Sequence, residues 1–133
     1  MTRKCTAQDL MSDVKVLVDT QATLLQVMEK MHRTKCPYAL VTGENLNAPC
    51  IITMTDMVQA VVQKGEFGDW LNEETVEQYM SPNLIMVKTI DLCRDILDLF
   101  VKTKVHQIVV IEEHDPVGVI TLVDLTTWFF GSL

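Results

Sequence analysis

The chain has 133 residues and is 48% hydrophobic, and its eleven basic residues are outnumbered by eighteen acidic ones, which gives a formal net charge of −7 at pH 7. A chain this acidic repels a phosphate backbone, so we do not expect it to bind duplex DNA or RNA. A local cluster of Lys, Arg or His can still form a positive pocket for a small phosphorylated ligand.

The cysteines and the apolar runs indicate the compartment. Cys5, Cys36, Cys50 and Cys93 show neither a Cys-x-x-Cys pair nor the spacing of a disulfide framework or a zinc site. Cys50 and Cys93 lie in apolar runs and are interpreted as small buried hydrophobic residues. A reducing cytoplasm is therefore the expected location. No apolar run approaches the roughly 18 residues that a membrane span needs, so we expect a soluble protein.

The first half of the chain predicts a strand, a helix, two strands paired as a hairpin, and a second helix. Residues 1–10 precede these elements as a polar lead-in that is either loosely ordered or packed on a surface. Thr20 or Thr23 is expected to cap the first helix, and Gly65 to end the second. In order, the five elements are expected at residues 14–18, 24–31, 38–42, 49–53 and 56–62.

The second half predicts the same order of elements. A connector over residues 66–79 leads to it, with one short helix that Pro82 stops. Asp91 is expected to cap the longer helix of this half. The strands and helices are expected at residues 84–87, 91–103, 107–111, 117–121 and 123–130. The aromatic run 128–130 either closes the core or forms a subunit interface.

The two halves are a sequence repeat. Thr53 and Asp56 match Thr121 and Asp124 at an offset of 68 residues. Further upstream the offset is 69, as between Met11-Ser12 and Met80-Ser81. We therefore expect repeats over residues 11–65 and 80–133, which fold as a pair because a unit of about 60 residues is marginal alone.

Each repeat carries a Thr-x-x-Asp sequence where a strand leads directly into a helix. In one interpretation this is a capping box, in which the threonine and the acid satisfy free amides of the first helical turn. In the other, the carboxylate accepts hydrogen bonds from two vicinal hydroxyls of a ribose. Gly118, ahead of the second motif, would let another group approach the strand closely. The pattern alone leaves both interpretations open.

The sequence Gly-Val-Ile-Thr-Leu-Val-Asp at 118–124, with Met-Ser-Pro at 80–82 and the order of elements, resembles a tandem pair of CBS (cystathionine β-synthase) domains, the Bateman module. The resemblance extends from about Met11 to Phe130. It implies an α/β (α+β) fold in which two β-α-β-β-α repeats pack with pseudo-two-fold symmetry into one compact module with two clefts between them. Such modules commonly bind AMP, ADP, ATP or S-adenosylmethionine.

The resemblance also implies roles for individual residues. Asp56 and Asp124 would hold ribose hydroxyls, Thr53 and Thr121 would contact ribose or phosphate, and Leu84 and Ile85 would border the adenine. Phosphate requires cationic or N–H donors, and Lys35, Lys104 and His106 are the candidates. These basic residues could equally complement the helix dipole. Cys50 stands where the second repeat has Gly118, and Pro37 where it has His106, so we expect unequal sites and one ligand per chain.

The expected function is a stand-alone regulatory module that binds an adenosyl ligand in an inter-repeat cleft and signals to a partner protein through the surface of a homodimer. The alternative is a ligand-free interaction or dimerisation domain, in which Thr-x-x-Asp only caps helices. No nucleophile–base pair or histidine cluster is recognised, so we expect no enzyme, no required cofactor and no metal site.

Overall fold

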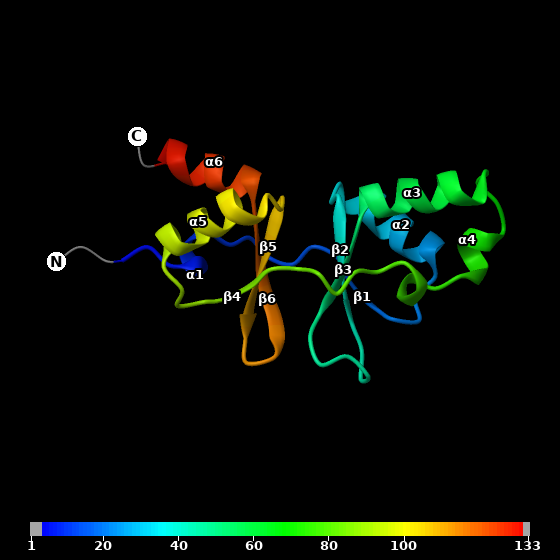
Figure 1. Ribbon diagram of the computed structural model, residues 1–133, viewed down its shortest axis with the longest axis horizontal. Coiled ribbons are helices and arrows are strands. Elements are labelled where there is room, and N and C mark those ends of the chain that lie inside the picture. The colour runs from blue at the N-terminus through cyan, green and yellow to red at the C-terminus, as the bar shows by residue number, and fades with distance from the viewer. Residues whose placement is uncertain (1–3, 132–133) are drawn as a thin grey trace. The chain divides into compact units, whose positions relative to one another are not determined.

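The computed structural model describes residues 4–131, in which each half of the chain forms a three-stranded sheet flanked by helices (Figure 1). The sheets have the orders β1-β2-β3 and β4-β5-β6. In chain order the elements are α1 (Ala7–Leu10), β1 (Leu17–Asp19), α2 (Leu24–Thr34), β2 (Tyr38–Thr42), β3 (Cys50–Thr53), α3 (Met54–Lys64), α4 (Trp70–Glu73), the 3₁₀ helix η1 (Val76–Gln78), β4 (Met86–Lys88), α5 (Cys93–Thr103), β5 (Gln107–Glu112), β6 (Asp115–Thr121) and α6 (Leu122–Gly131).

Both sheets have the same mixed pairing. The first strand of each runs parallel to the second, and the second and third form an antiparallel hairpin. The predicted α/β fold of two β-α-β-β-α repeats is therefore confirmed. The first strands begin later than expected, and α4 adds one helical turn within the connector.

Local signals explain most helix ends. Thr23 caps α2 by accepting a hydrogen bond of 3.2 Å from the Gln26 amide, and Gly65 ends α3 with φ of 82°. Asp91 does not cap α5, contrary to expectation. Leu92 is the N-cap residue, and the Asp91 carboxylate accepts a hydrogen bond from the Lys88 amide at 2.8 Å.

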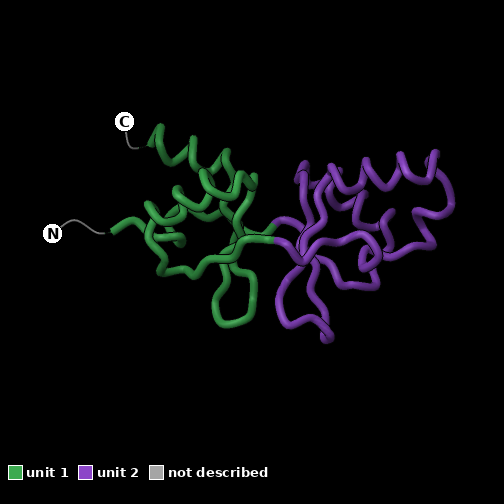
Figure 2. Tube along the Cα trace, viewed as in Figure 1, with its two compact units in different colours: residues 1–14, 84–133 green, residues 15–83 purple. Residues whose placement is uncertain are grey.

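The chain divides into two compact units that do not follow the sequence repeats (Figure 2). Residues 15–83 form what we call the continuous unit, whereas residues 1–14 and 84–133 together form the split unit, described here over 4–14 and 84–131. The segment that precedes each repeat thus joins the other repeat. We call residues 4–12 the N-terminal leader and the matching residues 73–81 the central leader.

Each leader pairs with the chain in the same way. In the split unit the Ala7 amide donates to the Asp91 carbonyl at 2.8 Å. In the continuous unit the Val76 amide donates to the Ala22 carbonyl, also at 2.8 Å. The four positions match at the repeat offset, so both units are built on one backbone frame.

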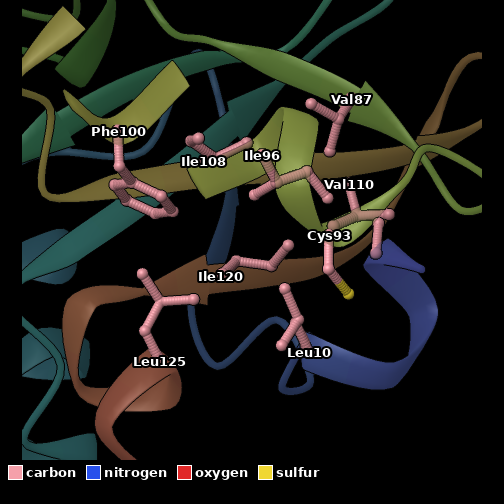
Figure 3. Packing of buried hydrophobic residues seen from close by; sticks show 10 residues of the cluster. Leu10, Val87, Cys93, Ile96, Phe100, Ile108, Val110, Ile120 and Leu125 are labelled. Atoms are coloured by element: carbon pink, nitrogen blue, oxygen red, sulfur yellow. The ribbon is translucent and has the colours of Figure 1, made fainter. Parts of the chain in front are cut away.

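The hydrophobic core of the split unit includes residues of the N-terminal leader. Ala7 and Leu10 of α1 are buried, and Figure 3 shows Leu10 pointing toward Ile120. The remaining buried members are Val87, Cys93, Ile96, Phe100, Ile108, Val110, Ile120 and Leu125. The lead-in predicted from the sequence therefore contributes to a core over part of its length.

Cys93 is not an isolated hydrophobic residue. It forms a disulfide with Cys5, across a Cα–Cα distance of 5.4 Å and 88 residues of sequence. The spacing rules missed this bond because its partners meet only through the fold. Cys36 and Cys50 are free and buried, as expected for Cys50, and burial raises the pKa of the Cys50 thiol. Among the helices of residues 4–131, none is long and apolar enough to cross a membrane.

Candidate functional site

The first Thr-x-x-Asp motif lies where β3 leads into α3. Thr53 has extended backbone angles and is the N-cap residue of α3. Oδ2 of Asp56 accepts hydrogen bonds from the Thr53 amide at 2.8 Å and from the Thr53 hydroxyl at 3.0 Å. The hydroxyl in turn accepts from the Asp56 amide at 3.3 Å. The motif is a complete capping box.

The second motif repeats this geometry where β6 leads into α6. Oδ2 of Asp124 accepts from the Thr121 amide at 2.8 Å and from the Thr121 hydroxyl at 3.0 Å. The Asp124 amide donates to the same hydroxyl at 3.1 Å. Capping therefore accounts for one oxygen of each carboxylate, and the other oxygen, Oδ1, decides what else each acid can do.

The two Oδ1 atoms differ. Oδ1 of Asp124 accepts a hydrogen bond from the Ser12 hydroxyl at 2.5 Å. Oδ1 of Asp56 has no hydrogen-bond partner among residues 4–131. Ser81, which matches Ser12 in the repeat, turns its hydroxyl the other way and accepts from the Asn83 amide at 3.1 Å. Oδ1 of Asp56 can therefore accept a hydrogen bond from an added donor, whereas Oδ1 of Asp124 already accepts one from Ser12.

The difference arises within one backbone frame. Ser12 and Val119 exchange two backbone hydrogen bonds of 2.9 Å each. Ser81 and Ile51, at the matching positions, exchange bonds of 2.8 and 2.9 Å. Pro82 follows Ser81, and its fixed φ favours the tight turn in which a serine hydroxyl accepts from the amide two residues later. The side-chain direction, rather than the backbone path, distinguishes the two sites.

The group that approaches Gly118 closely, as predicted, is the Met11 side chain of the N-terminal leader. A Cβ atom at this position would lie 2.8 Å from Cγ of Met11, nearer than real Cβ contacts come. Gly118 is therefore needed where the N-terminal leader crosses β6. Cys50 fills the matching position in the continuous unit and is buried.

The basic candidates lie at helix ends. Lys35 and Lys104 are the C-cap residues of α2 and α5, in left-handed conformations with φ of 56° and 59°, and both are exposed. His106 is also exposed, and its carbonyl accepts from the Leu122 amide at 3.3 Å. Lys35 lines an open cavity of about 450 Å³ with Glu29, His32 and Arg33.

The adenine-border candidates lie just before β4. Leu84 and Ile85 are half-buried, and the Ile85 carbonyl accepts from the Val109 amide at 2.9 Å. The Ile85 side chain packs against the core of the split unit. The described residues hold no group of three or more His, Cys, Asp or Glu placed to bind a metal ion.

Two features of the site were missed from the sequence. In the sequence Ser12 stands out only as part of the repeat, although a hydroxyl that is matched in both halves is a visible signal. The Cys5–Cys93 bond left no local signal. Both features belong to the N-terminal leader, which therefore contributes directly to the surroundings of Asp124.

The sequence matches the family model described as "CBS domain" twice, over residues 7–63 and 76–131. A comparison with curated proteins finds no match. Among solved structures, the chain is similar to a putative acetoin utilization protein (AcuB) from Vibrio cholerae, with a TM-score of 0.84 and 16% identity, covering 98% of this chain and 93% of that one.

Two similar structures contain adenosine derivatives. The CBS domain pair of protein MJ0100, in complex with 5′-methylthioadenosine and S-adenosyl-L-methionine, has a TM-score of 0.80 and 17% identity over 98% of this chain and 100% of that one. The CBS domain protein PAE2072 from Pyrobaculum aerophilum, complexed with AMP, has a TM-score of 0.75 and 19% identity over 90% and 89%. At these identities the likeness shows the fold alone. The two family matches together span most of the sequence, and the protein belongs to the CBS domain family as a tandem pair of CBS repeats.

Proposed function

We propose that this CBS pair is a regulatory, non-catalytic module of the cytoplasm that binds one adenosyl ligand and signals to a partner protein. Structurally similar CBS proteins bind AMP in one case and S-adenosylmethionine with methylthioadenosine in another, which supports this class of ligand. The adenosyl group, rather than the phosphate, is the feature that these ligands share.

The observation that carries the proposal is the state of Asp56. Its Oδ2 already completes the capping box, so the carboxylate is held in one orientation. Its Oδ1 has no partner among the described residues, and the side chain is only half-buried. A fixed carboxylate oxygen with free lone pairs is suited to accept hydrogen bonds from ribose hydroxyls. We therefore place the ribose at Asp56 rather than at Asp124.

The Thr53 hydroxyl contributes in a restricted way. Its hydrogen is donated to Asp56, and one lone pair accepts from the Asp56 amide. One lone pair remains, which suits a ribose hydroxyl as donor and not a phosphate oxygen. Lys35, which lies in the same unit as Thr53, is proposed as a cation for any phosphate. The candidates of the split unit, Lys104 and His106 for phosphate and Leu84 and Ile85 for the adenine, are proposed for a ligand whose ribose lies at Asp124.

The test is ligand binding by Asp56→Asn, with Asp124→Asn as the matched control. An Asn oxygen keeps the cap, but its NH₂ group replaces the Oδ1 acceptor. AMP, ADP, ATP and S-adenosylmethionine are each titrated by calorimetry and by thermal unfolding. A ligand at a hundredfold over its Kd adds about 2.7 kcal/mol of stability to the wild type. We expect Asp56→Asn to lose this gain and Asp124→Asn to keep it; no gain with any of the four ligands would refute the proposal.

The partner-facing part of the proposal rests on exposed apolar side chains. Met54, Val58 and Val62 are 39%, 56% and 73% exposed and follow one another at helical spacing along α3. Matching positions of α6 carry the exposed Leu122 and Phe130. We propose that each of these exposed stripes contacts a second copy of the chain in a homodimer. Light scattering should show a dimer that Val58→Lys dissociates, whereas Gln59→Lys, exposed on the same helix, should leave it intact.

A second function has one observation in its favour. Both Thr-x-x-Asp motifs are complete capping boxes, which is all that a ligand-free interaction domain would need. In that case Asp56→Asn would change neither ligand binding nor assembly, and none of the four ligands would raise the unfolding temperature.

A further inference from the structure

Three kinds of bond join the N-terminal leader to the rest of the split unit, residues 84–131. Cys5 is joined to Cys93 by the disulfide, at the start of α5. The Ala7 and Ser12 amides donate backbone hydrogen bonds to the carbonyls of Asp91 and Val119, at 2.8 and 2.9 Å. The Ser12 hydroxyl closes the segment onto Asp124. The covalent bond and the contact with the acid therefore lie at opposite ends of one short segment.

The central leader makes backbone hydrogen bonds that match those of the N-terminal leader but has no disulfide. The Leu24 amide donates to the Glu74 carbonyl at 3.1 Å, as the Cys93 amide donates to the Cys5 carbonyl at 3.0 Å. Glu74 and Leu24 are the residues that match Cys5 and Cys93 in the repeat. Both leaders share this backbone pairing, and the disulfide is added to it in the N-terminal leader alone. This is also the leader whose Ser12 hydroxyl donates to Oδ1 of Asp124.

We propose that Cys5–Cys93 is a redox latch: while oxidised it holds the N-terminal leader in place and keeps Ser12 on Asp124, and its reduction by a dithiol frees Asp124 to accept from a ligand. This inference rests on the proposed function, since it names the regulation of the second ribose-binding acid. Disulfides of cytosolic proteins are mostly redox-sensing or catalytic, which agrees with a bond that is made and broken.

The disulfide is placed where a reductant can reach it. A cavity of about 480 Å³ opens onto both sulfur-bearing residues, and its other lining residues are Lys4, Leu92, Arg94, Leu97 and Trp128. Cys5 is half-buried and Cys93 is 6% exposed, so Cys5 is the more exposed residue of the pair and the one that we propose is attacked. Arg94 and the positive end of α5 lie beside Cys93 and stabilise a thiolate leaving from it.

The reaction is a thiol–disulfide exchange. A thiolate of the dithiol attacks Sγ of Cys5, the S–S bond breaks, and its electron pair leaves on Sγ of Cys93. The second thiolate of the reductant then attacks the mixed disulfide and releases Cys5. The reductant becomes a disulfide, and the two cysteines gain two electrons and the two protons that the reductant's thiols lose.

Release of the leader is tested by amide hydrogen exchange on the full chain, oxidised and after treatment with dithiothreitol. The Ala7 and Ser12 amides should exchange at least about tenfold faster after reduction, because a tethered segment opens less often than an untethered one. Val76 and Ser81 of the central leader are the internal control and should not change. Cys5→Ser should exchange at the reduced rate in both conditions. Equal exchange in oxidised and reduced wild type overturns the latch.

The effect on the ligand site is tested in the Asp56→Asn background, where only Asp124 can hold a ribose. Titrated AMP should bind about tenfold more tightly after reduction, and Ser12→Ala in this background should bind at the tighter value in both redox states. Faster exchange without a change in AMP affinity overturns the coupling. If the wild type binds none of AMP, ADP, ATP or S-adenosylmethionine, the proposed function fails, and exchange alone then upholds or overturns the latch.

Discussion

The hydroxyl of Ser12 donates a hydrogen bond of 2.5 Å to Oδ1 of Asp124, which lies 112 residues further along the chain. Hydrogen bonds to charged groups stabilise more than neutral ones, and the pair is partly buried. Ser12→Ala is therefore expected to lower the free energy of unfolding by about 1–2 kcal/mol.

Ser81→Ala is the matched control for this prediction. Within residues 4–131, the Ser81 hydroxyl makes only one hydrogen bond, an exposed local one that it accepts from the Asn83 amide. Its replacement should change the free energy of unfolding by less than about 0.5 kcal/mol. Both values are measured by urea unfolding. If both variants lose the same free energy of unfolding, the Ser12–Asp124 bond stabilises the protein no more than the local turn bond of Ser81 does.

Gly118→Ala should destabilise the split unit because the added methyl group collides with Met11. Overpacking of this kind costs about 1–3 kcal/mol. Met11→Ala in the same chain opens the space, so the double variant should be more stable than the sum of the two single losses predicts. Strict additivity in urea unfolding would show that Met11 does not restrict Gly118.

The sequence predicts the features of this fold that depend on near neighbours. Thr20 or Thr23 was expected to cap α2, and Thr23 does so; Gly65 was expected at a helix end, and it ends α3, because caps act within one turn. A capping box was one of the two interpretations of Thr53 and Asp56, and the structure contains it. Asp91 shows the limit of such signals. An acid next to a helix can accept from amides on either side, and here it bonds to Lys88 and closes the preceding turn.

The sequence does not predict which half each leader joins. Thr6 to Ser12 matches Thr75 to Ser81 at an offset of 69, so equal surroundings could be expected for both segments. A repeat pattern is the same whether a leader packs on its own repeat or on the other one. The Cys5–Cys93 bond and the contact of Ser12 with Asp124 both follow from that choice, and they are the features that make the two acids unequal.

Lys35→Gly and Lys104→Gly should separate a structural role from a ligand role. A left-handed conformation costs a residue with a side chain roughly 1–2 kcal/mol, and glycine escapes this cost but has more freedom when unfolded. Each variant should therefore gain about 0.5–1 kcal/mol of stability without ligand. If a lysine holds phosphate, its variant should also bind ATP more weakly. A gain in stability with unchanged ATP affinity would assign that lysine to the helix end alone.

The pH dependence of stability should depend on Glu74. Its Oε2 lies 3.1 Å from Nζ of Lys64, and Oε1 accepts from the Tyr79 hydroxyl at 2.9 Å. Desolvation raises the pKa of Glu74, but the hydrogen bonds from Lys64 and Tyr79 outweigh it, so this pKa lies below its ordinary value of 4.5. The hydrogen bond to Glu74 raises the pKa of Lys64 above 10.5.

A carboxyl whose pKa is lowered by folding stabilises the protein above the unfolded pKa and loses this contribution as the pH falls. The Glu74 contribution should therefore be complete near neutral pH and disappear progressively below pH 4.5. Lys64 has the opposite sign, and its contribution should be lost as the pH rises above 10.5. Urea midpoints of the wild type and Glu74→Gln should differ at about pH 7, and the difference should shrink as the pH falls below 4.5. Glu73→Gln, on the exposed neighbour, should follow the wild type throughout, and a constant gap between Glu74→Gln and the wild type would contradict the prediction.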